Sequence, residues 1–594
     1  MLLETPAPHR FSSFPALRTL REYNARKFRR DVVAGLTVSV VELPQAMAYA
    51  LIAGVPPQYG IYTSIIQGVL GALLSSSEHL TTGPTNTQSL LIAAAVTRVS
   101  GVTHEAGDAV YLQLVFTLAF LKGLIQLSFW GLRFGQLVQF ISRSVILGIA
   151  TGAAVLILSG QLAYFLGVPR GEASRLWGVP ADIVRIWPHL GEINGLAVTI
   201  GLATVLLTAG LRQVNKFIPG ALIAVVLSAL LVGLFGWENR LQVVGPLPAD
   251  LPSLSLPVFD LDIWSQLLPG ALALALLGGI ETVAIAKTIA ARSGEEIVPN
   301  QEFFAQGFKN TLTSFFQCIP GSASFTRSAL DYDAGAQTRF AAILNAVFVC
   351  IMFFSLADYA RFIPYATLAG VLFVVAWGLL EPRYFFRVYK ADPSDAVVFA
   401  VTFFSTILLP LQYAVFIGVF LNIAFFLRTS SRLHINEMIQ TETGGFMERP
   451  IYDKAGDRKI MFVQLEGELF FAIADQLRDQ LNAIRRGGAQ VIILRLKRCH
   501  SIDATVLNVL EEFATDMKRR NGHLILCGVR PEAMRVLHAY GMDRVIGGQN
   551  LFPSGSGVYA GAKKALQRAR QLVGASIDTS DFKFDAEGEI TYDI

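Results

Sequence analysis

Two stretches of this sequence place small hydroxyl and amide side chains where apolar segments begin. In the first, Pro84 is followed by Thr85, Asn86 and Thr87. Proline suits the first turn of a helix because it has no backbone N–H to leave unpaired, and threonine and asparagine favour helix starts. The free N–H groups of a helix N-terminus attract anions. The pattern therefore predicts an anion-binding helix end at this point.

The second stretch repeats this arrangement and adds a permanent charge. Arg327 lies among its hydroxyl side chains, which are Ser322, Ser324, Thr326 and Ser328. The guanidinium of arginine has a planar fork of donors that suits oxyanions. Each helix N-terminus contributes about +0.5 charge, so two termini and Arg327 approach about +2 and balance a divalent oxyanion. A structural alternative stays open, in which the hydroxyls only cap helices and Arg327 pairs with a carboxylate such as Asp331.

A polar stripe precedes both stretches. Glu42, Gln45 and Tyr49 stand at i, i+3 and i+7, which is one face of a helix. Such a face in an apolar helix turns inward.

A second acidic residue, Glu281, stands in the apolar run LALALLGGIETVAIA. A charged side chain in the middle of a membrane costs at least about 2.5–3.5 kcal/mol, so it needs a partner, a cation or a proton. We expect Glu42 and Glu281 to bind a coupling ion, H⁺ or Na⁺, as an anion enters. A purely structural role remains the alternative for each.

The composition identifies the environment of these residues. The chain has 594 residues, of which 53% are hydrophobic and 16% charged, with a mean hydropathy of +0.49; soluble domains have about 25% charged residues. Charged residues are sparse from 32 to 440 and frequent from 441 onward, which predicts a membrane body and a soluble tail. The net charge of +4 is too small to indicate nucleic-acid binding. No motif for an enzyme, a metal site or a cofactor is present, so we expect only a coupling ion.

Apolar stretches long enough to cross a membrane occur in both halves of the chain. They lie at 32–53, 59–75, 108–130, 142–166, 193–212 and 216–236, and then at 264–290, 300–319, 338–356, 364–380, 394–410 and 411–428. Two interrupted segments, 84–99 and 323–334, stand third in each half. A broken segment at matching places in two halves is typical of inverted-repeat transporters. The sequence thus predicts an all-α membrane bundle of fourteen segments, a seven-plus-seven repeat with half-helices as segments three and ten.

The distribution of basic residues predicts the orientation. Seven of them precede Asp31, namely Arg10, Arg18, Arg21, Arg26, Lys27, Arg29 and Arg30. By the positive-inside rule the N-terminus is cytoplasmic. An even number of crossings then places the C-terminus in the cytoplasm as well, so both termini lie on the inner side of the cytoplasmic membrane.

The soluble part alternates short β-branched runs with helical spacing, which predicts a small α/β domain. The expected divisions are an N-terminal segment 1–31, a transmembrane domain 32–432, a linker 433–447, the α/β domain 448–572 and a flexible tail 573–594.

Several long motifs resemble the sulfate permease (SulP) family of anion transporters. They are DVVAGLTVSVVELPQAMAYALIAGVPPQYGIYTS (31–64), EHLTTGPTNTQSLL (78–91), ETVAIAKTIA with VPNQEFFAQGFKN (281–310) and GSASFTRSALDYDAGAQT (321–338). LRLKRCHSIDATVLNVL (494–510) is similar to the sulfate-transporter and anti-sigma-factor-antagonist (STAS) domain. The resemblance implies core and gate subdomains, an anion site between segments three and ten, and a homodimer.

The resemblance also implies roles for single residues. Thr326 and Arg327 match the family's Ser-Arg pair beside the anion, and Thr85 matches the first turn of its third segment. Gln45 and Tyr49 match family positions that line the binding cavity, and simple packing between helices is the alternative for both. Glu281 matches an acidic residue that helps to bind sodium in bicarbonate-transporting members. In the STAS domain, Ala504 stands where soluble relatives carry a phosphorylated serine, which argues against that switch; Thr505 is a less favoured acceptor.

These patterns favour a secondary transporter of an inorganic oxyanion, with sulfate as the favoured substrate. We expect transport to be coupled to protons or sodium and to occur by an elevator-type motion. A bicarbonate or dicarboxylate transporter, and an uncoupled exchanger or channel, are the alternatives. The expected partners are the small anion, membrane lipid, a second copy of the chain and a cytosolic protein that binds the STAS domain.

Overall fold

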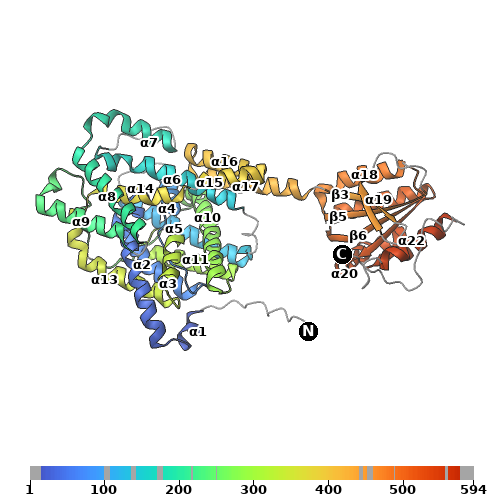
Figure 1. Ribbon diagram of the computed structural model, residues 1–594, viewed down its shortest axis with the longest axis horizontal. Helices are drawn as coiled ribbons and strands as arrows, with labels where there is room; N and C mark the ends of the chain where they lie inside the picture. Colours follow the sequence, from blue (N-terminus) through green and yellow to red (C-terminus); the bar gives the residue numbers. More distant parts are fainter. Residues whose placement is uncertain are drawn as a thin grey trace. The chain divides into compact units, whose positions relative to one another are not determined.

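In the computed structural model the chain forms two compact units, and the division between them along the sequence falls between Ile423 and Ala424. The structure describes residues 15–99, 108–135, 142–169, 178–215, 218–248, 250–380, 382–431, 433–440, 446–450, 459–486, 488–554 and 560–574. The first unit is helical and the second combines helices with a sheet (Figure 1).

A helix lies at each of the apolar stretches that the sequence predicts. In the first half these are α2 (Ala25–Ile52), α3 (Pro57–Leu74), α4 (Asn86–Val96), α5 (Ala109–Gly131), α6 (Arg143–Leu166), α8 (Gly195–Val214) and α9 (Gly220–Phe235). In the second half they are α10 (Leu261–Ser293), α11 (Pro299–Thr313), α12 (Phe325–Asp333), α13 (Phe340–Leu356), α14 (Tyr365–Leu379), α16 (Pro393–Leu408) and α17 (Leu411–Ser430).

Several of these helices are suited to a membrane. Seven of the described helices (α2, α5, α6, α8, α10, α13 and α17) are long and apolar enough to cross one, and α4, α9, α14 and α16 are shorter apolar helices. The count of fourteen crossings remains a prediction. The structure adds α1 (Ala16–Arg21), α7 (Gly178–Ile186) and α15 (Pro382–Ala391), which hydropathy did not indicate because they are short.

A two-stranded sheet joins the two halves. β1 (Thr82–Gly83) pairs antiparallel with β2 (Ser322–Ala323), and the first leads into α4 while the second leads into α12. The two short helices therefore begin beside each other. We expected Pro84 within the first turn of its helix, but α4 begins at Asn86 because the extended backbone of β1 continues to the N-cap residue Thr85.

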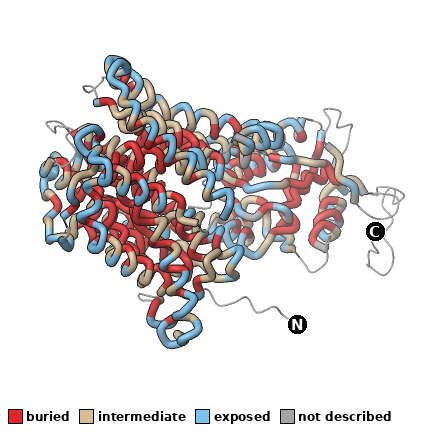
Figure 2. The backbone as a smooth tube through the Cα atoms, turned by 60° about the vertical axis from the view of Figure 1, so that its left-hand side comes forward, coloured by how far each residue is buried: buried red, intermediate tan, exposed pale blue. Residues whose placement is uncertain are grey.

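We call the β1–β2 pair and the starts of α4 and α12 the junction. Longer helices surround it. α2 packs against α3, α12 and α13, while α10 packs against α4, α5 and α12. Figure 2 shows that the buried residues concentrate inside the helical unit. The starts of α4 and α12 consequently lie among helices from both halves of the chain, which is where the sequence predicts the anion site.

The second unit is a six-stranded sheet with helices. The strand order is β4-β3-β5-β6-β7-β8, in which β5 (Ile460–Leu469), β6 (Val491–Ile502), β7 (His523–Val529) and β8 (Leu551–Pro553) are parallel neighbours. Its helices are α18 (Ala474–Arg486), α19 (Ala504–Arg519), α20 (Pro531–Tyr540), α21 (Met542–Ile546) and α22 (Ala560–Val573).

The expected linker 433–447 is instead largely part of this sheet. β3 (His434–Gln440) pairs antiparallel with both β5 and β4 (Phe446–Pro450). The physical reason is that β5 would otherwise present an unpaired edge. The expected flexible tail 573–594 lies almost wholly outside the described residues, since α22 ends at Val573.

Candidate functional site

An ion pair between α2 and α12 lies at the centre of the junction. The guanidinium of Arg327 donates a hydrogen bond to the carboxylate of Glu42, and both side chains are fully buried. It also donates to the carbonyl oxygen of Pro84 at 2.9 Å, while Asn345 Nδ2 donates to Glu42 Oε2 at 2.6 Å. Arg327 thereby joins α2, α12 and the segment that leads into α4.

Gly83 leaves the space that this ion pair needs. A Cβ atom on Gly83 would lie 3.0 Å from Arg327 Nη1 and 3.1 Å from Glu42 Oε1. A side chain at this position would therefore press on both partners of the ion pair.

Arg327 pairs with a carboxylate, as in the structural alternative, but the partner is Glu42 and not Asp331. Asp331, one turn further along α12, lies 3.7 Å from His79 Nδ1 instead. Glu42 is the partner because α2 packs across the start of α12. The +2 of the sequence-based charge balance is therefore reduced, since Glu42 neutralises Arg327.

The other acidic residue, Glu281, lies against the start of α4. The hydroxyl of Thr87 donates to Glu281 Oε1 at 3.0 Å, and the amide oxygen of Asn86 accepts a hydrogen bond from the Thr87 backbone N–H at 2.8 Å. Glu281 and Asn86 are both partly exposed. Glu281 is thus placed beside the N-terminus of α4.

The hydroxyl side chains have different roles. Ser324 caps α12 by accepting a long hydrogen bond of 3.5 Å from the Arg327 backbone N–H. Ser328 Oγ accepts a hydrogen bond from the Thr81 backbone N–H at 3.0 Å, so it holds the segment before β1. Thr326 is exposed at the start of α12, whereas the buried hydroxyl of Thr85 has no hydrogen-bond partner among the described residues.

Gln45 and Tyr49 are both buried next to this junction, with 6% of their surface exposed. The side-chain oxygen of Gln45 has no hydrogen-bond partner in the described part of the chain. Tyr49 packs in an apolar cluster with Ile157 of α6 and Leu372 of α14. The stripe on α2 therefore turns inward as expected, and Tyr49 contacts helices outside the junction.

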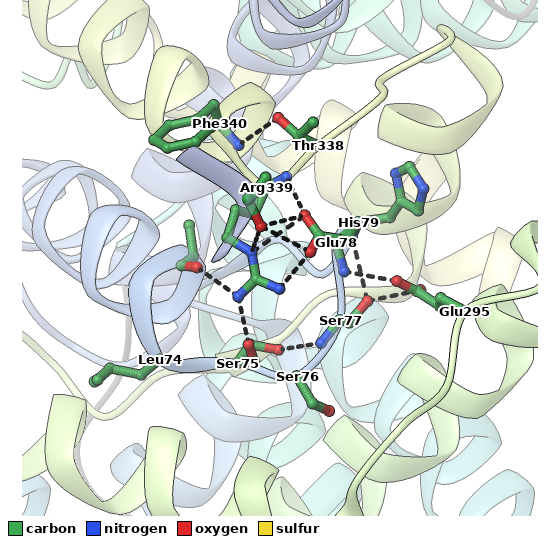
Figure 3. A network of polar contacts seen from close by, with 12 residues as sticks. Leu74, Ser75, Ser76, Ser77, Glu78, His79, Glu295, Thr338, Arg339 and Phe340 are labelled. Carbon is green, nitrogen blue, oxygen red and sulfur yellow. Dashed lines mark hydrogen bonds and ion pairs between the residues drawn. The ribbon is translucent and has the colours of Figure 1, made fainter. Parts of the chain in front are cut away.

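A polar network fixes the loop that leads into β1 (Figure 3). Arg339 donates to Glu78 Oε1 at 2.6 Å and to the carbonyl oxygen of Ser75 at 2.6 Å, and Glu295 Oε2 accepts from the Glu78 backbone N–H at 2.6 Å. Burial raises the pKa of Glu78, but the hydrogen bonds and charge of Arg339 outweigh burial and hold the pKa below its ordinary value. The loop that positions β1 and α4 is therefore tied to α13.

Comparison with known proteins identifies the family. Residues 28–402, more than half of the chain, match the sulfate permease family. The chain belongs to the sulfate permease family. Residues 452–556 match the STAS domain, which covers most of the second unit.

Relatives of this sulfate permease family member align over nearly its full length. The putative sulfate transporter YvdB of Bacillus subtilis (strain 168) is 30% identical over 540 residues, which cover 89% of this chain and 97% of YvdB. The structure of murine Solute Carrier 26 family member A9, an anion transporter in the inward-facing state, has a TM-score of 0.84 at 21% identity and covers 96% of this chain and 97% of that chain.

A second solved structure matches the helical unit. The transmembrane domain of the cyanobacterium bicarbonate transporter BicA has a TM-score of 0.59 at 23% identity and covers 67% of this chain and 98% of that domain. Both structural matches establish the fold of this sulfate permease family member.

A buried lysine that the sequence patterns did not single out, Lys122, also lies at this site. Lys122 lies in the apolar helix α5 and is fully buried. Its ammonium donates to Gln88 Oε1 of α4 at 2.6 Å and to the carbonyl oxygen of Gly321 at 2.7 Å. The signal was present, because a single charged residue in an apolar segment indicates a functional position as it did for Glu281.

In the STAS domain Ala504 and Thr505 lie at the start of α19. Ala504 is the first residue of α19, and Asp503 caps this helix by accepting a hydrogen bond from the Val506 backbone N–H at 2.9 Å. Thr505 is exposed in the same turn.

Proposed function

We propose that the protein is a secondary transporter of a small inorganic oxyanion, with sulfate favoured, across the cytoplasmic membrane. The observation that carries this proposal is the meeting of the N-termini of α4 and α12 at the β1–β2 pair. Each helix terminus supplies about +0.5 charge and free N–H donors. The partly exposed Asn86 and the exposed Thr326 supply polar groups beside them.

The substrate-binding residues that we propose are those of the two helix starts and of the α2 stripe. They are Gln45, Tyr49, Thr85, Asn86, Ser324, Thr326, Arg327 and Ser328. Among them Arg327 and Ser328 act mainly by holding the helix starts in place, because each is already bound to another segment. Thr85, Asn86 and Thr326 are then the groups that contact the anion.

Coupling to a cation follows from the charges around this site. The negative charge of Glu42 is neutralised by Arg327. Within the described residues, the carboxylate of Glu281 accepts hydrogen bonds only from the hydroxyl of Thr87, which is neutral. An anion that enters beside an ionised Glu281 meets repulsion, so binding is favoured when Glu281 takes up a proton or a sodium ion. Carboxylate and hydroxyl oxygens can hold such a cation. We therefore assign coupling to Glu281 and a structural role to Glu42.

The transport cycle that we propose moves the α4 and α12 starts as one body. The β1–β2 pair and the Arg327 contacts join these segments, which suits an elevator-type motion of the site across the membrane. Both termini lie in the cytoplasm, the protein forms a homodimer, and the STAS domain binds a cytosolic partner. The name of YvdB supports sulfate, while that of BicA supports bicarbonate as the alternative.

The test is uptake by the purified full-length protein in liposomes. Labelled sulfate and labelled bicarbonate are supplied outside the liposomes under three conditions: no ion gradient, a proton gradient directed inward (outside more acidic), and a sodium gradient directed inward. We expect sulfate to accumulate only under one of the two cation gradients. Accumulation of bicarbonate alone would reassign the substrate, and anion flux that ignores both gradients would identify an uncoupled exchanger or channel.

A further inference from the structure

Lys122 links the two segments that form the proposed site, α4 and the chain that leads into β2 and α12. Its ammonium bonds to Gln88, the third residue of α4, and to the carbonyl oxygen of Gly321, which immediately precedes β2. Asn310 Nδ2 also donates to this carbonyl oxygen, at 3.2 Å. Lys122 is therefore a buried cation directly behind the starts of both short segments.

The surroundings of Lys122 are built to hold it. Gly278 of α10 has no side chain, and a Cβ atom there would lie 3.3 Å from the Lys122 ammonium and 3.2 Å from Gln88 Nε2. No ion pair within 4.0 Å joins Lys122 to an acid among the described residues, and the two oxygens that accept hydrogen bonds from its ammonium there are neutral. Glu281 is close enough to interact with it electrostatically.

The charge balance of the junction gives Lys122 its importance. Glu42 neutralises Arg327 through a direct ion pair. Lys309 of α11 is also fully buried, and it interacts electrostatically with Lys122 and Arg327 as well as with Glu302 on its own helix. Its ammonium has no hydrogen-bond partner among the described residues. Of these two buried lysines, Lys122 is the one whose ammonium bonds to α4 and to the residue before β2. Its acidic counterpart, Glu281, is the group that we assign to the coupling ion.

We propose that Lys122 sets the charge selectivity of the anion site, favouring divalent over monovalent oxyanions. This inference rests on the proposed function. When a proton or sodium ion neutralises Glu281 and Lys122 carries its proton, Lys122 and the two helix termini together supply about +2, which matches a divalent oxyanion such as sulfate. Lys122 acts through its field and through the segments that it positions, without contacting the anion.

The field of Lys122 predicts a quantitative signature. The Coulomb energy between Lys122 and the anion is proportional to the charge of the anion. Removing Lys122 should therefore change the logarithm of the binding affinity twice as much for a divalent anion as for a monovalent one. A unit charge about 12 Å away at an effective dielectric constant of about 20 changes the affinity for a monovalent anion about tenfold. The corresponding change for sulfate is about 100-fold.

The experiment measures sulfate and bicarbonate binding to the purified full-length protein at a fixed pH. Bicarbonate is measured by its competition with labelled sulfate. The variants are Lys122→Met, Lys122→Gln and Lys122→Arg, and Lys287→Gln removes an exposed lysine as the control. We expect Met and Gln to lower sulfate affinity about 100-fold and bicarbonate affinity about tenfold, while Arg and the control keep the wild-type ratio.

Different failures have different meanings. Equal losses for both anions, or recovery of wild-type affinities by Lys122→Gln, would show that Lys122 acts only through its hydrogen bonds and would overturn the inference. Because Lys122→Met leaves Gln88 without its donor, Lys122→Gln provides the reading if the Met variant does not fold. A wild-type protein that binds neither anion would refute the proposed function itself.

Discussion

The carboxylate of Glu42 accepts a hydrogen bond from the guanidinium of Arg327, although 285 residues separate them in sequence. Both side chains are completely buried. A buried ion pair of this kind contributes little net stability, but removing one partner strands the other charge without water. The pair therefore specifies how α2 meets α12, and a single substitution has a larger effect than a double one.

We predict that Arg327→Gln destabilises the protein strongly, by about 3–5 kcal/mol, because it leaves the Glu42 carboxylate buried and unpaired. The double variant Glu42→Gln/Arg327→Gln should recover much of this loss. Thermal unfolding of the four proteins in detergent, analysed as a double-mutant cycle, checks the prediction. Additive losses in the double variant would mean that the two side chains do not interact energetically.

We predict that Glu281→Gln separates anion binding from the cation gradient. A neutral amide no longer needs a proton or sodium ion, so the dependence of anion affinity on that cation, expected to be about 5- to 150-fold, should disappear. Anion counterflow without a gradient should continue. The measurement is sulfate uptake into liposomes with and without each gradient, and Glu302→Gln is the matched buried-acid control. Retained coupling in Glu281→Gln would place the cation elsewhere.

The sequence was informative where the signal is local. Pro84, Thr85 and Ser324 marked the starts of α4 and α12, and the isolated Glu281 in an apolar segment lies against the start of α4. The partner of Arg327 was not predictable in this way. Asp331 is the near neighbour in sequence, whereas Glu42 becomes the partner only through the packing of α2 on α12.

Two other differences have similar causes. Lys122 carries the same kind of signal as Glu281, but its role depends on contacts with α4 and β2 that no local pattern encodes. The strand β3 follows α17, the last helix before the sheet, and its pairing with β5 is a tertiary contact. A short segment at a domain boundary thus resembles a linker until its neighbour in the sheet is known.

We predict that the ion pair between Glu78 and Arg339 makes stability depend on pH. The pKa of Glu78 in the folded protein lies below its ordinary value of 4.5, so its stabilising effect is present above pH 4.5 and is lost as the pH falls below it. The difference in melting temperature between wild type and Glu78→Gln should therefore be largest near neutral pH and shrink in acid. A difference that stays constant down to pH 3 would contradict an electrostatic origin.

We predict that both termini are cytoplasmic. The basic residues before Asp31 favour an inner N-terminus, and an even number of crossings returns the chain to the same side. Protease added to right-side-out vesicles should leave residues 441–594 intact, and permeabilised vesicles serve as the positive control. Release of this fragment from sealed vesicles would show that the number of crossings is odd.

We predict that an isolated STAS domain needs β3 to fold. Met438 of β3 is buried against the cluster that contains Phe462 and Ile493, and Ile435 packs on the opposite cluster. A fragment that begins at residue 448 loses these contacts and exposes the edge of β5, which invites association with other chains. A fragment that begins at residue 431 should be a monomer with cooperative thermal unfolding.

The matched point variant separates the role of packing from that of strand pairing. Met438→Ala in the longer fragment keeps the backbone of β3 and removes one buried side chain, so it should cost about 2–5 kcal/mol and remain monomeric. Size-exclusion chromatography and circular dichroism of the three fragments are the measurements. If the fragment from residue 448 is monomeric and as stable as the longer one, β3 contributes nothing to the domain, and the edge of β5 is protected by some other segment.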